Sequence, residues 1–295
     1  MAPSTEPLYE ITPAAEAMTF GSARVRVVRA GWFRPDAGGF FGVVPRPLWS
    51  RMVDADERGR VLCRLNLLLV EAGGKRILVE TGTGERMSDK DREIKGIEGG
   101  NPAVALRELG EDPAGIDLVI VSHLHYDHAG GMVDAVGRPL FLNARYIVQR
   151  DDAEAARGDE LRLQGIMEAE QLHRVQVAGQ LAEVHGEVEV APEVRVVRTG
   201  GHTRGSQAVI IGPKASSPTA IFFGDLIPTR WQLPVRWTSA FDDYPIDAVA
   251  VRQELLNRAI AGGWWCYFTH DPGPMPVQLA LSERGAVVVS EPQQP

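Results

Sequence analysis

The sequence has few cysteines, and none of them is placed to pair. Its 295 residues include two, Cys63 and Cys266, which lie far apart in apolar, strand-like runs. The spacings of zinc ribbons and redox motifs are therefore missing, and we expect two buried thiols. A chain of this length can bury a core without disulfides or a structural metal, so metal ligands in it are expected to serve function.

Long apolar runs and basic clusters are missing too. No segment reaches 18 uninterrupted apolar residues, which argues against a membrane span. The N-terminal MAPSTEPLYEITPAAEAM lacks the basic and then apolar order of a secretory signal, so we expect a cytoplasmic protein. The formal net charge is −8 and no stretch is dominated by Lys or Arg, which argues against a nucleic-acid partner.

Neither an internal repeat nor a linker-like stretch divides the chain, so we predict one domain over residues 1–295, with an N-terminal extension over 1–23. Helices are predicted at Pro102–Leu109, as one or two within Asp152–Gln176, and at Ile246–Ala261. Strands are predicted at Arg24–Ala30, Val61–Glu71, Lys75–Thr81, Asp117–Ser122, Val188–Arg198, Gln207–Ile211, Thr219–Phe223, Trp264–Thr269 and, as a hairpin, within Gln278–Val289. Two such halves predict an α/β fold in which two mixed sheets face each other under outer helices.

Three of the seven histidines fall in one hexapeptide, His123–His128, which reads HLHYDH and is followed by two glycines. It begins directly after the apolar run Asp117–Ser122, at the carboxyl end of a predicted strand, where sites in α/β sheets usually lie. Imidazole and carboxylate groups suit zinc, iron and manganese. A divalent cation would also remove the repulsion within so dense a cluster, so we interpret the hexapeptide as part of a metal site rather than a chance surface cluster.

Three more candidate ligands follow predicted strands: His202 in TGGHT, Asp225 in FFGD and His270 in YFTHD. A carboxylate that closes an apolar strand is costly unless it is paired or bound to metal. Each of the three alone could be an ordinary polar strand end, but together with the hexapeptide they favour a metal site. The remaining histidines, His173 and His185, lie in polar surroundings and are interpreted as surface residues.

These motifs resemble the metallo-β-lactamase superfamily. The hexapeptide matches its HxHxDH signature, and Thr81-Gly82 resembles its DTG turn with Glu80 in place of the aspartate. The resemblance spans about Arg24 to Val289 and implies a four-layer αββα sandwich. It also implies a ligand set: the first metal held by His123, His125 and His202, the second by Asp127, His128 and His270, and both bridged by Asp225.

The resemblance implies a metal-dependent hydrolase with two divalent ions, zinc as the first choice and iron, manganese or cobalt as alternatives. Two such ions about 3.5–4 Å apart would share a water, lower its pKa toward 7 and polarise the substrate oxygen. Asp127 and Asp225 are the predicted catalytic residues, because each could also orient the hydroxide or carry its proton.

SHLHYDHAGG and FTHD resemble the N-acyl homoserine lactonases and the methyl parathion hydrolase group. The expected reaction is therefore cleavage of an ester or lactone, with phosphotriesters or thioesters as alternatives. The lactonases carry a tyrosine three residues after the bridging aspartate, whereas this chain has Pro228. An iron-dependent oxidoreductase of the same fold and a binding module without activity are further alternatives.

Aromatic residues gather in loop-like segments, one of them a predicted active-site loop over residues 32–60. Because exposed apolar groups in loops often mark binding surfaces, we predict a fairly apolar small-molecule substrate. The same aromatics could instead pack on the core or form a homodimer interface. The predicted substrate-binding residues are Trp32, Phe40, Phe41, Trp231 and Trp237.

Overall fold

A computed structural model of the chain describes residues 17–214, 218–283 and 285–291. Of the predicted N-terminal extension, residues 1–16 lie outside this range, and Met18–Phe20 form the first strand, β1. The described residues form two mixed sheets with helices on the outside. The predicted α/β sandwich is thereby confirmed.

The first sheet has the strand order β1-β2-β3-β4-β6-β7-β8, with the short β5 added beside β2. Strands β4, β6, β7 and β8 run parallel to one another, whereas β1 to β4 pair as antiparallel neighbours. After β1 the strands are β2 (Ala23–Phe33), β3 (Cys63–Ala72), β4 (Lys75–Val79), β5 (Glu98–Gly99), β6 (Leu118–Ile120), β7 (Arg145–Gln149) and β8 (Leu181–Val184).

The second sheet has the order β15-β14-β13-β12-β11-β10-β9. Its pairs are antiparallel except for β12 and β13, which are parallel. The strands are β9 (Glu187–Ala191), β10 (Val194–Arg198), β11 (Gln207–Ile211), β12 (Ala220–Phe222), β13 (Trp265–Tyr267), β14 (Val277–Ser282) and β15 (Gly285–Ser290).

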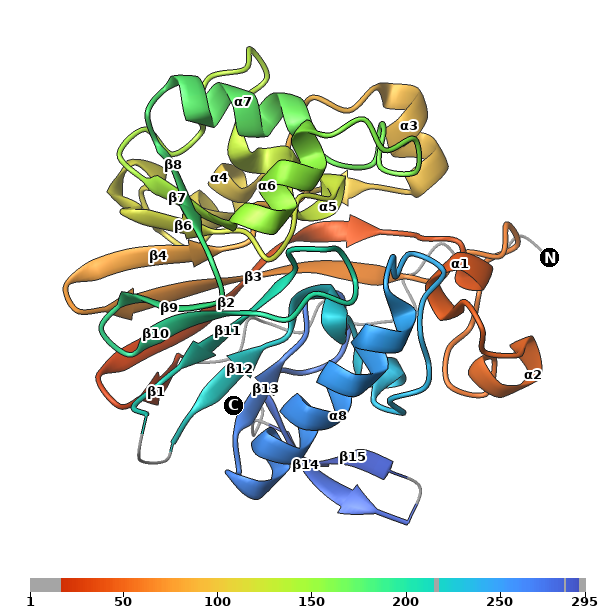
Figure 1. Cartoon of the computed structure of the whole chain (residues 1–295). Coiled ribbons are helices and arrows are strands. Elements are labelled where there is room, and N and C mark those ends of the chain that lie inside the picture. Colours follow the sequence, from red (N-terminus) through yellow and green to blue (C-terminus); the bar gives the residue numbers. More distant parts are fainter. Residues whose placement is uncertain (1–16, 215–217, 284, 292–295) are drawn as a thin grey trace.

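Helices cover the outer face of each sheet, which gives the four layers (Figure 1). The first sheet is covered by α4, α5, α6 and α7, and the second by α8, while α1 and α2 lie near one end of the sandwich. No helix among the described residues has the length and apolarity needed to cross a membrane. The helices are α1 (Ala37–Phe41), α2 (Arg46–Trp49), α3 (Asp89–Lys95), α4 (Pro102–Glu108), α5 (Tyr126–Ala129), α6 (Arg150–Arg157), α7 (Ala169–Val177) and α8 (Pro245–Ala261).

The sequence of β3 shows why the sheets lie inside the sandwich. Its run Leu65–Val70 is buried on both faces. Leu68 and Val70 pack between the sheets, whereas Leu67 and Leu69 belong to the core beneath the outer helices. Because successive strand residues point to opposite faces, a strand covered on both sides is mostly apolar, and Asn66 is the polar exception in this run.

Two sequence predictions need correction. The segment Val188–Arg198, predicted as one strand, is a hairpin of β9 and β10 that turns at Pro192 and Glu193. Glu193 has a φ of +62°, which the carboxylate stabilises by accepting hydrogen bonds from Ser22. The strands β1, β5, β7 and β8 were not predicted, whereas the one or two helices predicted within Asp152–Gln176 correspond to α6 and α7.

Strand direction determines where polar loops meet. Strands β10, β12 and β13 run the same way, since β11 is antiparallel to both β10 and β12, and β13 is parallel to β12. In the other sheet, β4, β6 and β7 also share one direction. The loops after β6, β10, β12 and β13 carry the predicted ligands. Ligand sites in α/β proteins typically lie at such carboxyl ends.

Asn66 of β3 ties the two sheets together at this end. Its buried amide donates hydrogen bonds to the carbonyl oxygens of Phe268, at 3.2 Å, and Asp271, at 2.8 Å. Its backbone N–H donates to the carbonyl of Thr269 at 2.9 Å. These bonds fix the segment after β13 against the first sheet.

We expect Asn66→Ala to lower the free energy of unfolding by about 1–3 kcal/mol, because it leaves buried carbonyls without donors. The control is Asn143→Ala, which removes an exposed amide bonded to the carbonyl of Ala114 and should cost within about 0.5 kcal/mol. Urea unfolding with a chelator present, so that metal affinity does not contribute, measures both. Equal effects of the two variants would contradict the role of Asn66.

Candidate metal centre

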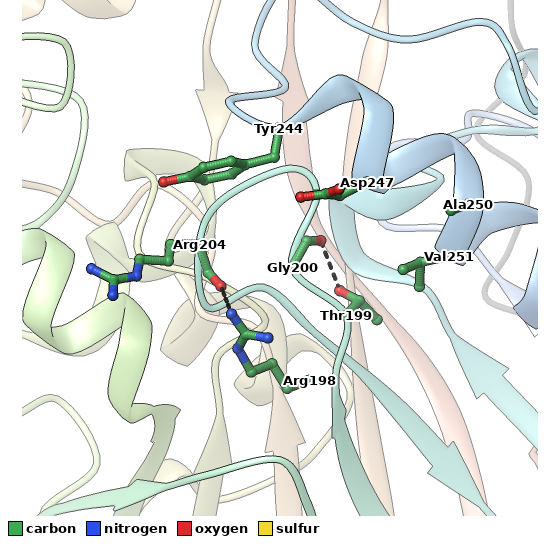
Figure 2. A pocket seen from close by; sticks show the side chains of 9 residues that line it. Arg198, Thr199, Gly200, Arg204, Tyr244, Asp247, Ala250 and Val251 are labelled. Atoms are coloured by element: carbon green, nitrogen blue, oxygen red, sulfur yellow. Dashed lines mark hydrogen bonds between the residues drawn. The ribbon is translucent and has the colours of Figure 1, made fainter.

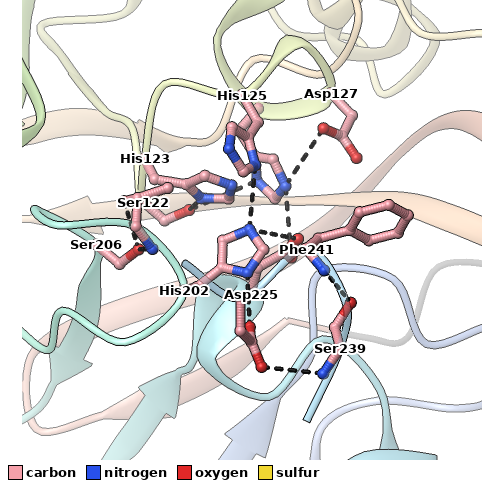
Figure 3. A network of polar contacts seen from close by, with 12 residues as sticks. Ser122, His123, His125, Asp127, His202, Ser206, Asp225, Ser239 and Phe241 are labelled. Atoms are coloured by element: carbon pink, nitrogen blue, oxygen red, sulfur yellow. Dashed lines mark hydrogen bonds and ion pairs between the residues drawn. The ribbon is translucent and has the colours of Figure 1, made fainter. Parts of the chain in front are cut away.

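The seven predicted ligands come from four loops and converge on one place. Ligand atoms of three groups lie within 4.8 Å of one another: His123, His125 and His202; Asp127, His128 and His270; and His123, His128 and Asp225. The first two groups coincide with the two sets that the sequence resemblance implies. Figure 3 shows the contacts that join His202 to His125 and to Asp225, and His123 to Ser122.

Asp225 lies between the two sets and faces each with a different oxygen. Its Oδ2 is 3.5 Å from Nε2 of His202, in the first set. Its Oδ1 is 3.4 Å from Nε2 of His128 and 3.2 Å from Nε2 of His270, in the second. A carboxylate placed in this way can serve two cations at once.

The hydrogen bonds of the imidazoles fix which nitrogen faces the centre. His270 must donate from Nδ1 to the carbonyl oxygen of Arg64, 2.9 Å away, because a carbonyl only accepts. In the same way Nδ1 of His202 donates to the carboxylate of Asp242 at 2.9 Å. In the neutral form, Nε2 of each ring is then a bare acceptor.

These bare nitrogens face the carboxylate oxygens of Asp225 and other ring nitrogens at close range. Nε2 of His202 is 3.1 Å from Nδ1 of His125, and Nε2 of His270 is 3.3 Å from Nε2 of His128. The lone pairs of these nitrogens and of the Asp225 oxygens repel unless a proton or cation lies between them. Neutral imidazole and carboxylate are also the donors that zinc prefers. The residues therefore fit a divalent cation in each set.

Two buried atoms of the cluster have no hydrogen-bond partner among the described residues. They are Nε2 of His123 and Oδ1 of Asp225. Nδ1 of His123 lies 3.0 Å from Oγ of Ser122, so it is Nε2 that is left over. Burial, and then the neighbouring histidines, hold the pKa values of His123 and His125 well below the usual range, which keeps both rings neutral. Neutral imidazole is the form that binds metal.

Glu80 holds His128. Its Oε1 lies 3.3 Å from Nδ1 of His128, and its Oε2 accepts from the backbone N–H of Ser122 at 3.3 Å. Burial opposes protonation of His128, but the carboxylates of Asp225, Glu80 and Asp127 outweigh it and raise the pKa of that ring. Glu80 has a φ of +71°, a strained conformation that is typical of functional sites.

Asp152, at the start of α6, joins two of the ligand loops. Its fully buried carboxylate accepts from the backbone N–H of Leu124, inside the hexapeptide, at 2.7 Å. It also accepts from the hydroxyl of Thr203 and, at 3.2 Å, from the N–H of Gly205, beside His202. Asp152 thereby fixes the spacing of His125 and His202, and its role leaves no local pattern in the sequence.

Asp242 and Arg252 form a buried ion pair behind His202. Asp242 accepts from His202 with Oδ1 and, with Oδ2, from Arg252 at 3.1 Å. The guanidinium of Arg252 also donates to the carbonyl of Leu226, next to Asp225. Arg252 is fully buried in α8. It therefore connects the loops of His202 and Asp225, and the sequence prediction missed both members of the pair.

A cavity of about 600 Å³ opens onto the cluster. His125, Asp127, His202, Asp225 and His270 all lie on its wall. The rest of the wall comes from connections between strands, mainly residues 33–60, 162–166 and 239–243. The predicted active-site loop contributes Phe40 of α1, the residues that precede this helix, and Arg58 and Arg60.

The five predicted substrate-binding aromatics are placed differently. Phe40 lines the cavity. Phe41 and Trp231 are buried behind it, where Phe41 stacks on Trp49 at 5.1 Å and lies 6.1 Å from Trp231, measured between ring centroids. Trp32 contacts the guanidinium of Arg64, and Trp237 lines a separate hollow. Apolar wall residues outside the predicted set include Phe33, Ile94, Leu163, Ile166 and Phe241.

The other residues singled out in the sequence lie away from the cluster or inside the core. His173 and His185 are exposed, and Cys63 and Cys266 are buried and free. A second hollow, of about 460 Å³, lies beside Gly200 of the His202 loop and Asp247 and Val251 of α8 (Figure 2). None of the seven clustered residues is among the nine described residues that line it.

We expect Asp242→Asn to weaken zinc binding by about 10- to 100-fold, as loss of a carboxylate that orients a ligating histidine does elsewhere. Competition with a coloured chelator measures the affinity. Asp243→Asn is the matched control, because its carboxylate pairs with Arg162 rather than a histidine. Equal affinities of the two variants would show that Asp242 does not orient His202.

The chain matches the known family that its motifs resemble. The family description "Metallo-beta-lactamase superfamily" matches residues 61–271. An "N-acyl homoserine lactonase" of Bacillus sp is 27% identical over 179 residues, which are 59% of this chain and 62% of that protein. This chain therefore spans less than two thirds of that relative's length.

Solved structures share the whole fold. A "probable metal-dependent hydrolase" from Staphylococcus aureus superposes with a TM-score of 0.85 at 26% identity, over 93% of this chain and 98% of the other. AidC, described as a dizinc quorum-quenching lactonase, gives 0.79 at 19% identity, over 94% and 98%. The second likeness shows the fold alone. Since the family match covers most of the chain and includes all seven clustered residues, this protein belongs to the metallo-β-lactamase superfamily.

Proposed function

We propose that this protein is a metal-dependent hydrolase that cleaves an ester or lactone bond of a fairly apolar small molecule. The observation that carries the proposal is the cavity, which joins an apolar wall to five of the seven clustered side chains. We further propose two divalent ions per chain, with zinc as the first choice, held by His123, His125 and His202, by Asp127, His128 and His270, and by Asp225 between them.

Bound divalent ions at such a site supply a lowered pKa for water and polarisation of a substrate oxygen. The protein's own groups would orient the reactants. Asp127 and Asp225 both lie on the cavity wall, so either carboxylate can accept a proton there and pass it to the leaving oxygen. Phe33 and Phe40 lie on the same wall, and the Phe33 ring packs on the ring of His270 at 4.7 Å between centroids. These rings would exclude water beside the cluster and so strengthen electrostatic interactions there.

The lactone alternative is supported by the names of the relatives, and Pro228 bears on it. Pro228 lies on the cavity wall and its carbonyl accepts from the N–H of His270 at 2.9 Å. It offers no hydroxyl to a substrate. A lactone would therefore have to be oriented by other wall groups, so acyclic esters and lactones both belong in the test.

The test is a hydrolysis panel on zinc-reconstituted protein with aryl esters, γ- and δ-lactones, thioesters and phosphotriesters. We expect esters or lactones to be cleaved fastest, at about two zinc equivalents per chain by elemental analysis. Asp225→Asn should reduce kcat/KM by about 100-fold or more, while the Tm of the metal-free protein changes little. The proposal is overturned if no member of the panel is hydrolysed. It is also overturned if iron-loaded protein consumes oxygen faster than the zinc-loaded protein hydrolyses any ester or lactone.

The apolar wall makes a separate prediction about binding. Ile166 lines the cavity with 42% of its surface exposed, whereas Leu161 is 86% exposed and is not part of the wall. Ile166→Ala should raise KM for long-chain esters by about threefold or more, because it removes apolar contact area. Leu161→Ala, the matched control from the same loop, should leave KM unchanged. Equal KM values in both variants would show that Ile166 does not contact the substrate.

A further inference from the structure

The cavity carries more positive charge than the acidic chain would suggest. The net charge of the chain is −8. Apart from the clustered Asp127 and Asp225, the wall has two carboxylates, Asp36 and Asp243. It has five cationic side chains, which are Arg34, Arg58, Arg60, Lys95 and Arg162.

Three of these cations are neutralised by a neighbouring carboxylate. The pairs are Arg34 with Glu98 at 2.8 Å, Arg60 with Asp56 at 2.8 Å, and Arg162 with Asp243 at 2.7 Å. These arginines also donate to backbone carbonyls, so they have structural roles. The pairs account for Arg34, Arg60 and Arg162 without a ligand.

Lys95 and Arg58 remain. Within the described ranges, no carboxylate lies within 4.0 Å of either charged group, and neither side chain makes a hydrogen bond. Nζ of Lys95 lies 4.0 Å from the centroid of the Tyr126 ring, which comes between His125 and Asp127 in the hexapeptide. An aromatic face attracts a cation without cancelling its charge. Lys95 is thus held at the cavity, close to the cluster, with its charge unpaired.

Arg58 is held on the same wall by the loop that carries it. Asp56 accepts from the backbone N–H groups of Arg58 and Arg60, each at 2.9 Å. The guanidinium of Arg60 in turn donates to the carbonyl of Ile94, the neighbour of Lys95, at 2.8 Å. The loop is therefore fixed against the end of α3, which brings Arg58 and Lys95 to one side of the cavity.

A divalent metal centre makes this placement costly unless an anion is bound. Two divalent ions would exceed the charge of Asp127 and Asp225, and Lys95 would add a further positive charge nearby. A negative group between the metal centre and the two cations would relieve this repulsion. The apolar residues Phe40, Leu163 and Phe241 on the same wall would meanwhile contact an uncharged part.

We propose that the substrate is itself anionic: besides the bond that is cleaved, it carries a carboxylate that Lys95 and Arg58 bind. This inference rests on the proposed ester or lactone hydrolase and narrows its substrates to apolar molecules with one negatively charged end. The charged end selects and orients the substrate, and it takes no part in bond cleavage.

The test compares matched substrates on zinc-loaded protein. Monophenyl adipate, pimelate and suberate carry a free carboxylate, and phenyl hexanoate, heptanoate and octanoate are their neutral counterparts. We expect kcat/KM to favour the anionic ester at the chain length that reaches the cations. The ratio of kcat/KM for the anionic ester to that for its neutral counterpart should fall about fivefold in Lys95→Met. It should fall further in the double variant Lys95→Met/Arg58→Gln, and it should also fall when salt is added.

Lys90→Met is the matched control, because Lys90 lies in the same helix, is exposed and is not on the wall. Lys95→Arg keeps the charge and should keep the preference. If neutral esters are cleaved but no anionic ester is preferred, or if Lys90→Met lowers the preference as much as Lys95→Met, the inference is wrong and the proposed hydrolase stands.

If no ester is cleaved, the proposed function fails and binding decides the inference. Calorimetry then compares adipate, pimelate and suberate with the monocarboxylates of equal length, in which one carboxylate can reach the metals. Binding of the second carboxylate by Lys95 and Arg58 is supported if a dicarboxylate binds more tightly than the monocarboxylate of equal length, and if Lys95→Met removes this difference while Lys90→Met keeps it. Equal affinities of the mono- and dicarboxylates overturn it.

Discussion

Buried acceptors that face one another are the constraint on which this structure depends. His202 and His270 must donate from Nδ1 to Asp242 and to the carbonyl of Arg64, so their Nε2 atoms are turned toward Asp225 and other imidazoles. Such an arrangement is unfavourable without a cation and favourable with one. The surrounding structure therefore has to hold these groups in place whether or not a cation is present. Buried partners on neighbouring elements supply that rigidity.

These partners differ in what they connect. Asp152 binds the backbone of the hexapeptide and of the His202 loop, so it fixes one set of imidazoles from outside the cluster. Arg252 links Asp242 to the turn beside Asp225 and so spans both sets. Removing one partner of a buried ion pair leaves an uncompensated charge, which costs more than the pair contributes. The Asp242–Arg252 pair is accordingly a positioning device rather than a source of net stability.

Local signals in the sequence predicted two mixed sheets and a metal site, and the family resemblance added the four-layer sandwich and the set of seven side chains. Apolar runs that end in His or Asp mark strand ends, and parallel strands bring such ends to one edge. Asp152, Asp242 and Arg252 could not be found in this way, since only the tertiary structure brings them to the loops they hold. The aromatics were predicted less well for a related reason. Phe40 and Phe41 are neighbours in α1, yet one lines the cavity and the other packs on Trp49.

The cluster and the cavity wall face different physical demands. The clustered side chains lie at strand ends that both sheets hold rigidly, where a small displacement would separate ligand atoms that now lie within 4.8 Å. The wall comes from connections, where Lys95 ends a short helix and Arg58 lies in a loop fixed by Asp56. Changes in such connections cost little folding stability. The size, apolarity and charge of the substrate can therefore change through the wall while the strand ends keep the cluster intact.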